Sequence, residues 1–188
     1  MTDPFFFGYG SLVNRATHDY PHATRATAKG WGRAWRQTSL RPAAYLSAVE
    51  APGLEIDGLI AAVPGADWVA LDERETAYFR QPVRDIRHDH PAQPEIQIYR
   101  TQPEFEVELP EPHPILLSYL DVVVQGYLQE FGIDGADRFF ATTSGWSAGI
   151  LNDRADPIYP RHQILCRSET AFVDNGLARL AAVVKQRH

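Results

Sequence analysis

The chain has 188 residues, of which 44% are hydrophobic and 22% are charged, and its formal net charge is −6. These proportions are typical of a globular protein, and the length suffices for the core of one domain. An acidic chain lacks the excess of Lys and Arg that a sequence-independent nucleic-acid binder needs, so we expect no nucleic-acid partner. The single cysteine, Cys166, excludes an intrachain disulfide and multi-cysteine metal sites, and we expect it to be a small core residue.

The sequence gives no sign of a membrane or export segment. No apolar stretch approaches the length of a membrane-spanning helix. The triplet Phe5-Phe6-Phe7 is too short for the core of a signal peptide, and Asp3 stands before it in place of a basic region. We therefore expect a cytoplasmic protein without a membrane partner, and the sequence leaves its oligomeric state open.

Strands are predicted to dominate the beginning of the chain. Four of them are expected at residues 4–8, 26–38, 44–49 and 56–63. Gly30 and Gly32 indicate a bulge or close packing in the second strand. Ala51-Pro52-Gly53 is a turn signal and predicts a break between the third strand and the fourth.

The next segment, residues 66–79, has the periodicity of one amphipathic helix. Four apolar side chains share a face when successive residues turn by about 100°: Trp68, Leu71, Tyr78 and Phe79. Glu75 projects from the middle of this face, whereas Glu73 and Arg74 point away from it. A carboxylate among apolar side chains loses hydration, so we expect a raised pKa and a base able to act near neutral pH. The alternatives are a glutamate neutralised by a nearby arginine and a helix rotated so that Glu75 reaches solvent.

Helices are predicted to dominate the remainder, after two further strands. The expected elements are strands at 83–87 and 95–100, a proline-rich linker at 103–114, a helix at 115–131, a short helix at 136–142, an ordered loop at 144–161 and a final helix at 169–185. Gly132 is a natural stop for the first of these helices. Strands followed by helices, without regular alternation, favour the α+β class.

A glycine-containing loop follows the first predicted strand, with the sequence Gly8-Tyr9-Gly10-Ser11-Leu12. A buried strand that runs into such a loop can bring backbone N–H groups close to an anion. The spacing matches neither a nucleotide P-loop, nor the dinucleotide fingerprint, nor a nucleophile elbow. A tight turn without a ligand is the structural alternative.

Two other groups of residues are candidates for chemistry or for packing. His88 and His90 would share one face of a strand. These two histidines supply only two of the four ligands of a tetrahedral metal site, so we expect no metal. Trp31, Trp35 and Trp146 are expected to be core or rim aromatics.

Together these pieces resemble the gamma-glutamylcyclotransferase superfamily, and specifically bacterial proteins similar to the ChaC and AIG2-like groups. The loop Phe7-Gly8-Tyr9-Gly10-Ser11-Leu12 is similar to the family's Tyr-Gly-Ser loop, and Trp31-Gly32-Arg33-Ala34-Trp35-Arg36 is similar to its second strand. The segment Leu71-Asp72-Glu73-Arg74-Glu75-Thr76-Ala77-Tyr78 looks like the helix that carries the family's catalytic glutamate. The resemblance covers roughly residues 5–100.

The resemblance implies a small mixed β-barrel surrounded by helices, with a helical C-terminal extension. It implies an enzyme that releases 5-oxoproline from a γ-glutamyl amide or peptide, glutathione being one candidate, without a cofactor or a metal. Glu75 would be the catalytic acid and base, and the substrate-binding residues would be Tyr9, Gly10, Ser11, Leu12 and Tyr78.

The predicted organisation is a catalytic core at residues 1–102 and a linker with a mainly helical part at 103–188, packed together as one domain. Residues 118–161 have no counterpart in the ChaC core, and they are interpreted as a lid or a partner surface. Three alternative functions stay open: a binding module for a small γ-glutamyl compound or amino acid, an enzyme for another γ-glutamyl-amine or isopeptide, and a metal-dependent hydrolase that uses His88 and His90.

Overall fold

The computed structural model describes residues 3–187, so the outermost residues of the two predicted units, 1–2 and 188, lie outside it. The strands are β1 (Phe5–Gly8), β2 (Thr24–Arg36), β3 (Tyr45–Ala62), β4 (Tyr78–Pro82), β5 (Ile86–His88), β6 (Ile96–Thr101), β7 (Ile115–Leu116), β8 (Thr143–Ser144), β9 (Ile150–Asn152) and β10 (Val184–Gln186). The α-helices are α1 (Val69–Arg74), α2 (Leu117–Ala141) and α3 (Arg167–Arg179). Short 3-10 turns are η1 (Ser11–Val13), η2 (Arg15–Thr17), η3 (Pro64–Ala66), η4 (Pro103–Phe105) and η5 (Trp146–Ala148).

A seven-stranded mixed sheet forms the centre of the molecule. Its strand order is β4-β6-β1-β3-β2-β5, and β8 pairs with β2. The β1 strand is antiparallel to β3 and parallel to β6, which places it in the middle of the sheet with both edges paired. The α+β prediction and the mixed sheet surrounded by helices are confirmed. Among the described residues the strand order begins at β4 and ends at β5, so the sheet is open and only loosely resembles a barrel.

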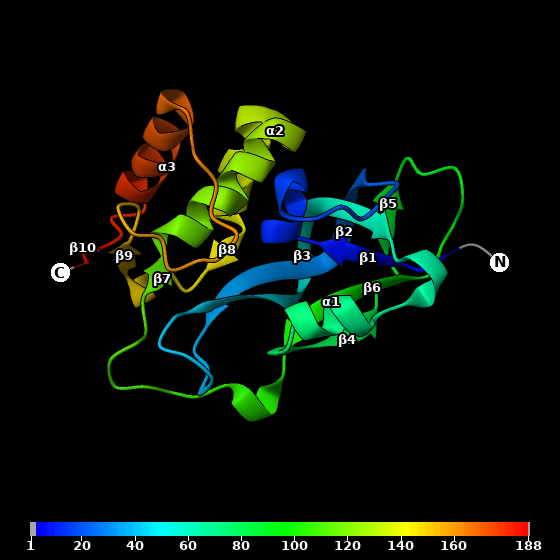
Figure 1. The fold of residues 1–188 in the computed structure, drawn as a ribbon, viewed down its shortest axis with the longest axis horizontal. Helices are drawn as coiled ribbons and strands as arrows, with labels where there is room; N and C mark the ends of the chain where they lie inside the picture. Colours follow the sequence, from blue (N-terminus) through cyan, green and yellow to red (C-terminus); the bar gives the residue numbers. More distant parts are fainter. Residues whose placement is uncertain (1–2, 188) are drawn as a thin grey trace.

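The helices lie on different sides of this sheet. Figure 1 shows α2 and α3 next to each other at one end of the molecule, and α1 beside β4 and β6. A small parallel sheet of β10, β9 and β7 lies at the foot of α2 and α3. The predicted stop at Gly132 is confirmed as a break inside α2, where this residue has a φ of 68°.

Two predicted strand and helix boundaries are wrong for the same reason: pairing partners distant in sequence override local signals. The Ala51-Pro52-Gly53 signal does not separate two strands, because β3 continues through it. There Trp31 pairs with Glu50 and Lys29 pairs with Glu55, so β3 bulges outward opposite Gly30. The C-terminal helix ends at Arg179 instead of 185, because the last residues pair with β9 as β10.

The predicted helix at 66–79 is wrong in its second half. The α-helix ends at Arg74, and Tyr78 and Phe79 belong to β4, which pairs with β6. Pairing with a neighbouring strand stabilises an extended backbone that helical periodicity alone cannot detect. Cys166 is also not a core residue, because it is exposed at the N-cap of α3.

The core joins the sheet to α2. Trp31 and Trp35 are buried and Trp146 packs against the same cluster, which confirms their predicted core or rim positions. The hydroxyl of Tyr127, on α2, donates to the carbonyl oxygens of Tyr9 (2.9 Å) and Asp57 (2.6 Å). These bonds fasten the helix to the chain directly after β1.

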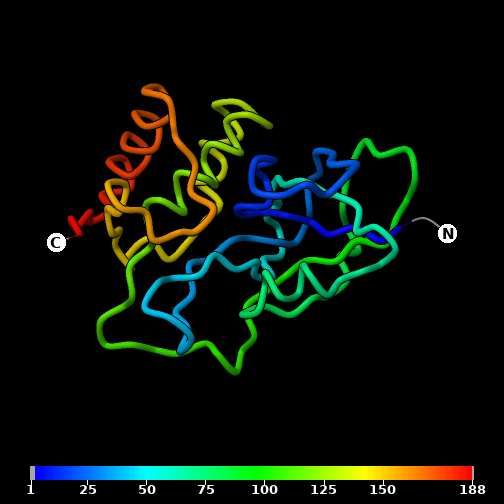
Figure 2. The backbone as a smooth tube through the Cα atoms, viewed as in Figure 1, coloured from blue at the N-terminus to red at the C-terminus, as the bar shows by residue number. Residues whose placement is uncertain are grey.

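The connection between β6 and α2 runs along the surface. Figure 2 shows residues 103–114 passing beside the loop at residues 37–44. The Ser39 N–H donates to Phe105 O (2.9 Å), and the Val107 N–H donates to Gln37 O (3.0 Å). Apart from η4 this segment is largely irregular, and it supports a neighbouring loop. Within the described residues no helix is both long and apolar enough to cross a membrane.

Replacing Gly126 by Ala tests the contact between α2 and Asn14, which lies between η1 and η2. A Cβ atom there would lie 2.7 Å from the Asn14 backbone nitrogen and 2.9 Å from its Cα. Gly→Ala inside a helix ordinarily stabilises by up to about 1 kcal/mol, but here overpacking should destabilise by about 2 kcal/mol. Urea unfolding measures the difference, with the exposed Gln129→Ala on α2 as control. A Gly126→Ala protein as stable as wild type would contradict this packing.

Candidate functional site

Glu75 lies where α1 ends and the chain turns toward β4. Leu71, fully buried, anchors the short helix, and the Glu75 N–H donates to Leu71 O (2.9 Å). Glu75 itself has left helical geometry, with φ −102° and ψ 35°. Asp72 holds the helix against the sheet by accepting bonds from Arg80 (2.7 Å) and from the Tyr99 hydroxyl (2.6 Å). The glutamate is thus fixed at the junction between helix and strand.

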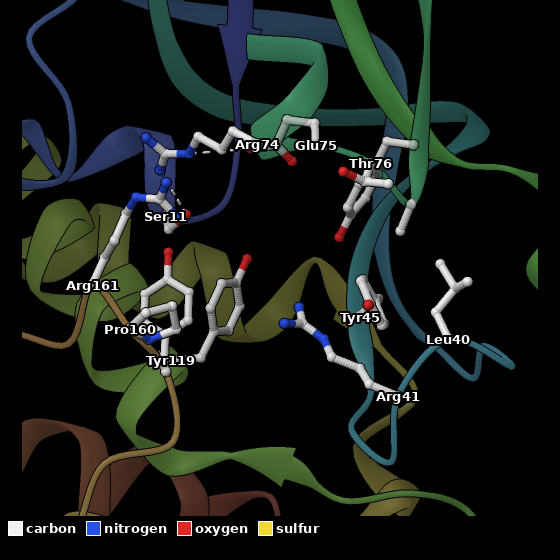
Figure 3. Close-up of a pocket in the computed structure, with 13 residues that line it drawn as sticks. Ser11, Leu40, Arg41, Tyr45, Arg74, Glu75, Thr76, Tyr119, Pro160 and Arg161 are labelled. Atoms are coloured by element: carbon white, nitrogen blue, oxygen red, sulfur yellow. Dashed lines mark hydrogen bonds and ion pairs between the residues drawn. The ribbon is translucent and has the colours of Figure 1, made fainter. Parts of the chain in front are cut away.

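A cavity of about 300 Å³ opens beside Glu75. Figure 3 shows the side chains around it, which come from loops and helices far apart in the sequence. They are Ser11, Leu40, Arg41, Tyr45, Arg74, Glu75, Thr76, Ala77, Tyr78, Tyr119, Tyr159, Pro160 and Arg161. This volume is within the range of small-molecule sites.

A second, smaller cavity of about 30 Å³ adjoins it and shares Ser11, Glu75, Tyr78 and Tyr119 with the larger one. Its volume suffices for about one water molecule. Its lining contains all the residues predicted from sequence: Tyr9, Gly10, Ser11, Leu12, Glu75 and Tyr78. The structure therefore brings the predicted catalytic residue and all the predicted substrate-binding residues to one place.

The glycine loop presents its backbone to this place. Its first turn is η1, whose carbonyl groups at Gly10 and Ser11 accept from the N–H groups of Val13 and Asn14, both at 3.0 Å. The N–H groups at the start of such a turn have no partner within the turn itself, and the Tyr119 hydroxyl lies against the N–H of Ser11. A Cβ atom on Gly10 would lie 2.7 Å from the Tyr119 hydroxyl, so only glycine fits here without displacing that side chain.

The electrostatic state of Glu75 is set by burial and by three arginines. Its side chain is 16% exposed. Burial raises the pKa of Glu75, and the charges of Arg74, Arg161 and Arg41 oppose that rise. The predicted direction of the shift is confirmed. The predicted apolar surroundings are not, because tyrosines and arginines line the cavity and Trp68 lies under the Arg80 guanidinium instead (4.3 Å).

Arg74 does not point away from Glu75, as the helical prediction required. Its Nε lies 3.3 Å from Glu75 Oε1, and its side chain is 9% exposed. The guanidinium also donates to Thr17 O (2.9 Å), Thr17 Oγ1 (3.2 Å) and Ser11 Oγ (3.4 Å). One arginine therefore connects the glutamate to the turn that follows β1, and it places the carboxyl beside the loop.

The tyrosines near Glu75 remain protonated at neutral pH. Burial is the main reason that the pKa values of Tyr9, Tyr78 and Tyr119 all lie well above the ordinary range. The Tyr9 hydroxyl donates to Tyr99 O (2.7 Å), and the Tyr78 hydroxyl donates to Leu46 O (2.9 Å). Among the described residues lining the larger cavity Glu75 is the one carboxyl group, so it is the group there that can exchange a proton near neutral pH.

Several residues at the cavity were missed by sequence reasoning. The missed residues with polar or aromatic side chains are Arg41, Tyr45, Arg74, Thr76, Tyr119, Tyr159 and Arg161. Tyr119 and Arg161 belong to the segment 118–161, for which the sequence predicts a lid or a partner surface, and they form part of the cavity wall. No local motif surrounds them in the sequence, so sequence reasoning had no signal for them.

His88 and His90 lie apart from this cavity. Their ring centroids are 6.4 Å apart, and the His90 ring meets the edge of Phe5 at 4.8 Å. Across residues 3–187 no group of three or more His, Cys, Asp and Glu side chains is placed to hold a metal ion.

Comparisons with solved structures identify the fold. A gamma-glutamyl cyclotransferase superimposes with a TM-score of 0.58 at 12% identity, covering 92% of this chain and 99% of that one. The uncharacterized protein loc79017 from Homo sapiens gives 0.58 at 14% identity, covering 93% and 99%. YkqA from Bacillus subtilis gives 0.57 at 17% identity over 77% of this chain and 57% of YkqA. No family model matches the sequence, and no curated protein matches it significantly.

The chain therefore has the gamma-glutamyl cyclotransferase fold, and the resemblance predicted from its motifs is confirmed at that level. At these sequence identities the likeness extends to the fold and not to the reaction.

Replacing Glu75 by Gln tests the desolvation of this carboxyl through stability. Because folding raises the pKa of Glu75, the protonated carboxyl makes its full contribution to the free energy of unfolding below pH 4.5, the ordinary glutamate value. This contribution is lost as the pH rises through the folded-state pKa. Glu75→Gln lacks this loss. Its free energy of unfolding, relative to wild type, should therefore increase between about pH 4.5 and pH 8.

Urea unfolding across this pH range provides the measurement. The exposed neighbour Glu73 supplies the control, because Glu73→Gln should show no such trend. If Glu75→Gln and wild type lose or gain stability in parallel at every pH, the carboxyl is hydrated in the folded protein.

Proposed function

We propose that this protein is a gamma-glutamyl cyclotransferase, which converts a γ-glutamyl amide or peptide into 5-oxoproline and a free amine. The observation that carries this proposal is one desolvated carboxyl group, Glu75, which shares a cavity of about 300 Å³ with Ser11 of the glycine loop. The fold shared with a gamma-glutamyl cyclotransferase supports it.

The reaction needs a folded substrate more than it needs an enzyme nucleophile. The α-amine of the glutamyl group attacks its own γ-carbonyl carbon, a C–N bond of the five-membered ring forms, and the original amide C–N bond breaks. Both reacting groups belong to one molecule, so holding the chain in the folded-back geometry removes much of the entropic barrier. The step consumes no water and requires no cofactor.

Glu75 provides the proton transfer. The α-amine is protonated in water and cannot attack until its proton is removed, and the departing amine must gain a proton. The attacking nitrogen loses one proton before it attacks and a second as the ring closes, and the leaving nitrogen gains both. A carboxylate that accepts each proton in turn and passes it to the leaving nitrogen accomplishes both transfers. With an ordinary pKa of about 4, a glutamate is a weak base for an ammonium group. The raised pKa of Glu75 reduces that mismatch.

The loop after β1 holds the negative charge. The N–H groups of Gly10, Ser11 and Leu12 are suited to the α-carboxylate or to the oxyanion that develops at the γ-carbonyl. Tyr9 supports this loop from beneath through its bond to Tyr99 O (2.7 Å). Tyr78 forms a wall of the same space, with its hydroxyl fixed on Leu46 O (2.9 Å).

The most direct functional test is Glu75→Gln, which keeps the shape of the side chain and removes the base. Release of 5-oxoproline from γ-glutamyl substrates should fall by about 10²-fold or more, whereas substrate binding should persist. Glu73→Gln serves as the control, because that side chain is exposed at the same helix end. Glu75→Gln turning over at the wild-type rate would refute the assigned role. Binding without 5-oxoproline release by wild type would favour a binding module.

A second test addresses the loop. Gly10→Val should weaken substrate binding, because the added atoms meet the Tyr119 hydroxyl and the Leu46 side chain, both of which line the smaller cavity. Calorimetric titration with a γ-glutamyl compound measures the affinity, and the thermal midpoint reports whether the variant folds normally. Unchanged affinity in a folded variant would remove the loop from the site.

A further inference from the structure

Two arginines at the cavity have no acidic partner. Arg74 is paired with Glu75 at 3.3 Å. In contrast, no carboxylate of residues 3–187 lies within 4.0 Å of the guanidinium of Arg41 or of Arg161. Both residues are exposed, both line the cavity, and both act electrostatically on Glu75. Cations without partners beside a cavity are suited to an anionic ligand.

The two arginines occupy different sides of the cavity. In Figure 3 the Arg161 guanidinium lies beside Ser11 and Arg74, near the start of the glycine loop. The Arg41 guanidinium lies apart from this group and points into the cavity from the opposite wall, below Glu75. The cavity therefore has two separated cationic positions, one at the loop and one across from the carboxyl group.

Arg41 is held in place by its loop. The Ser39 N–H donates to Phe105 O and the Ala44 N–H donates to Pro114 O, both at 2.9 Å. The guanidinium also stacks over the ring of buried Tyr45, 4.4 Å from its centroid. A stacked guanidinium keeps its edge free for a planar carboxylate, so little ordering would be needed on binding.

The charges of the possible substrates differ in a way that these positions can detect. A γ-glutamyl amino acid or peptide has two carboxylates and one ammonium group, whereas a γ-glutamyl alkylamine has one carboxylate and one ammonium group. With the α-carboxylate at the glycine loop and Arg161, the first class places its second carboxylate in the leaving half. A γ-glutamyl alkylamine has no carboxylate in its leaving half, so it offers Arg41 no anion to bind.

We propose that Arg41 binds a carboxylate on the leaving half of the substrate, so that the protein prefers γ-glutamyl amino acids and peptides to γ-glutamyl amines. This inference rests on the proposed function and specifies its substrate class. Arg41 is a specificity-determining residue: it contacts the part of the substrate that departs, and Glu75 retains the proton transfer. A cationic leaving group would be repelled at the same position.

The experiment compares γ-glutamylglycine with γ-glutamylmethylamide, which differ only in the carboxylate of the leaving half. Wild type should process γ-glutamylglycine with a kcat/KM about tenfold higher, the order expected for a charge-assisted hydrogen bond. In Arg41→Gln this ratio should fall toward one, mainly through a higher KM for γ-glutamylglycine. Arg41→Lys should keep part of the ratio because it keeps the charge. Arg84→Gln, at an exposed arginine outside both cavities, should keep the wild-type ratio.

Salt provides an independent readout. Raising ionic strength from about 0.05 to about 0.5 M should reduce the wild-type ratio and leave that of Arg41→Gln nearly constant. The inference about Arg41 is overturned if the wild-type ratio of the two kcat/KM values is near one, or if Arg41→Gln keeps the wild-type ratio. In either case, release of 5-oxoproline would still support the proposed function. If neither compound yields 5-oxoproline, the proposed function fails, and the ratio of calorimetric affinities for the two compounds then tests Arg41 in the same way.

Discussion

The ion pair between Arg74 and Glu75, shielded from bulk water, is the constraint on which the site depends. Burial alone would leave a carboxyl group protonated, and full hydration would leave it a weak base. Arg74 lies 3.3 Å away and limits the rise in pKa without cancelling it. The same guanidinium reaches Ser11 and Thr17, so the geometry of the acid and that of the loop are coupled. A displacement of either would alter both proton transfer and anion binding.

Much of this arrangement could be predicted from sequence because its signals are local. The apolar run at β1, the glycines of the loop after it and the acidic residue at position 75 are each visible within a few residues. Their juxtaposition follows from β1 being central, since a loop at the end of a central strand meets the segment that crosses that end of the sheet. The change from strands to helices along the chain likewise indicated the α+β class.

The remainder could not be predicted because it depends on pairing between distant segments. Helical periodicity predicts that Arg74 points away from the face that carries Glu75, but α1 ends at Arg74, so the rotation of about 100° per residue no longer applies at Glu75. Tyr78 has the spacing of a helical core residue and belongs to a strand, since β6 supplies its partner. Arg41 and Arg161 reach the cavity from irregular segments, whose course is set by tertiary contacts such as the bond from Ser39 to Phe105.

The protonation midpoint of the Glu75 carboxyl shows whether this side chain is a desolvated base or an ordinary surface glutamate. Carbon-13 NMR of the Glu75 side-chain carboxyl, assigned by its loss in Glu75→Gln, follows that group directly through a pH titration of the folded wild-type protein. The account predicts a midpoint above the ordinary glutamate value of 4.5. A midpoint at or below 4.5 would mean that the carboxyl is hydrated or dominated by its arginines, and it would contradict the central claim.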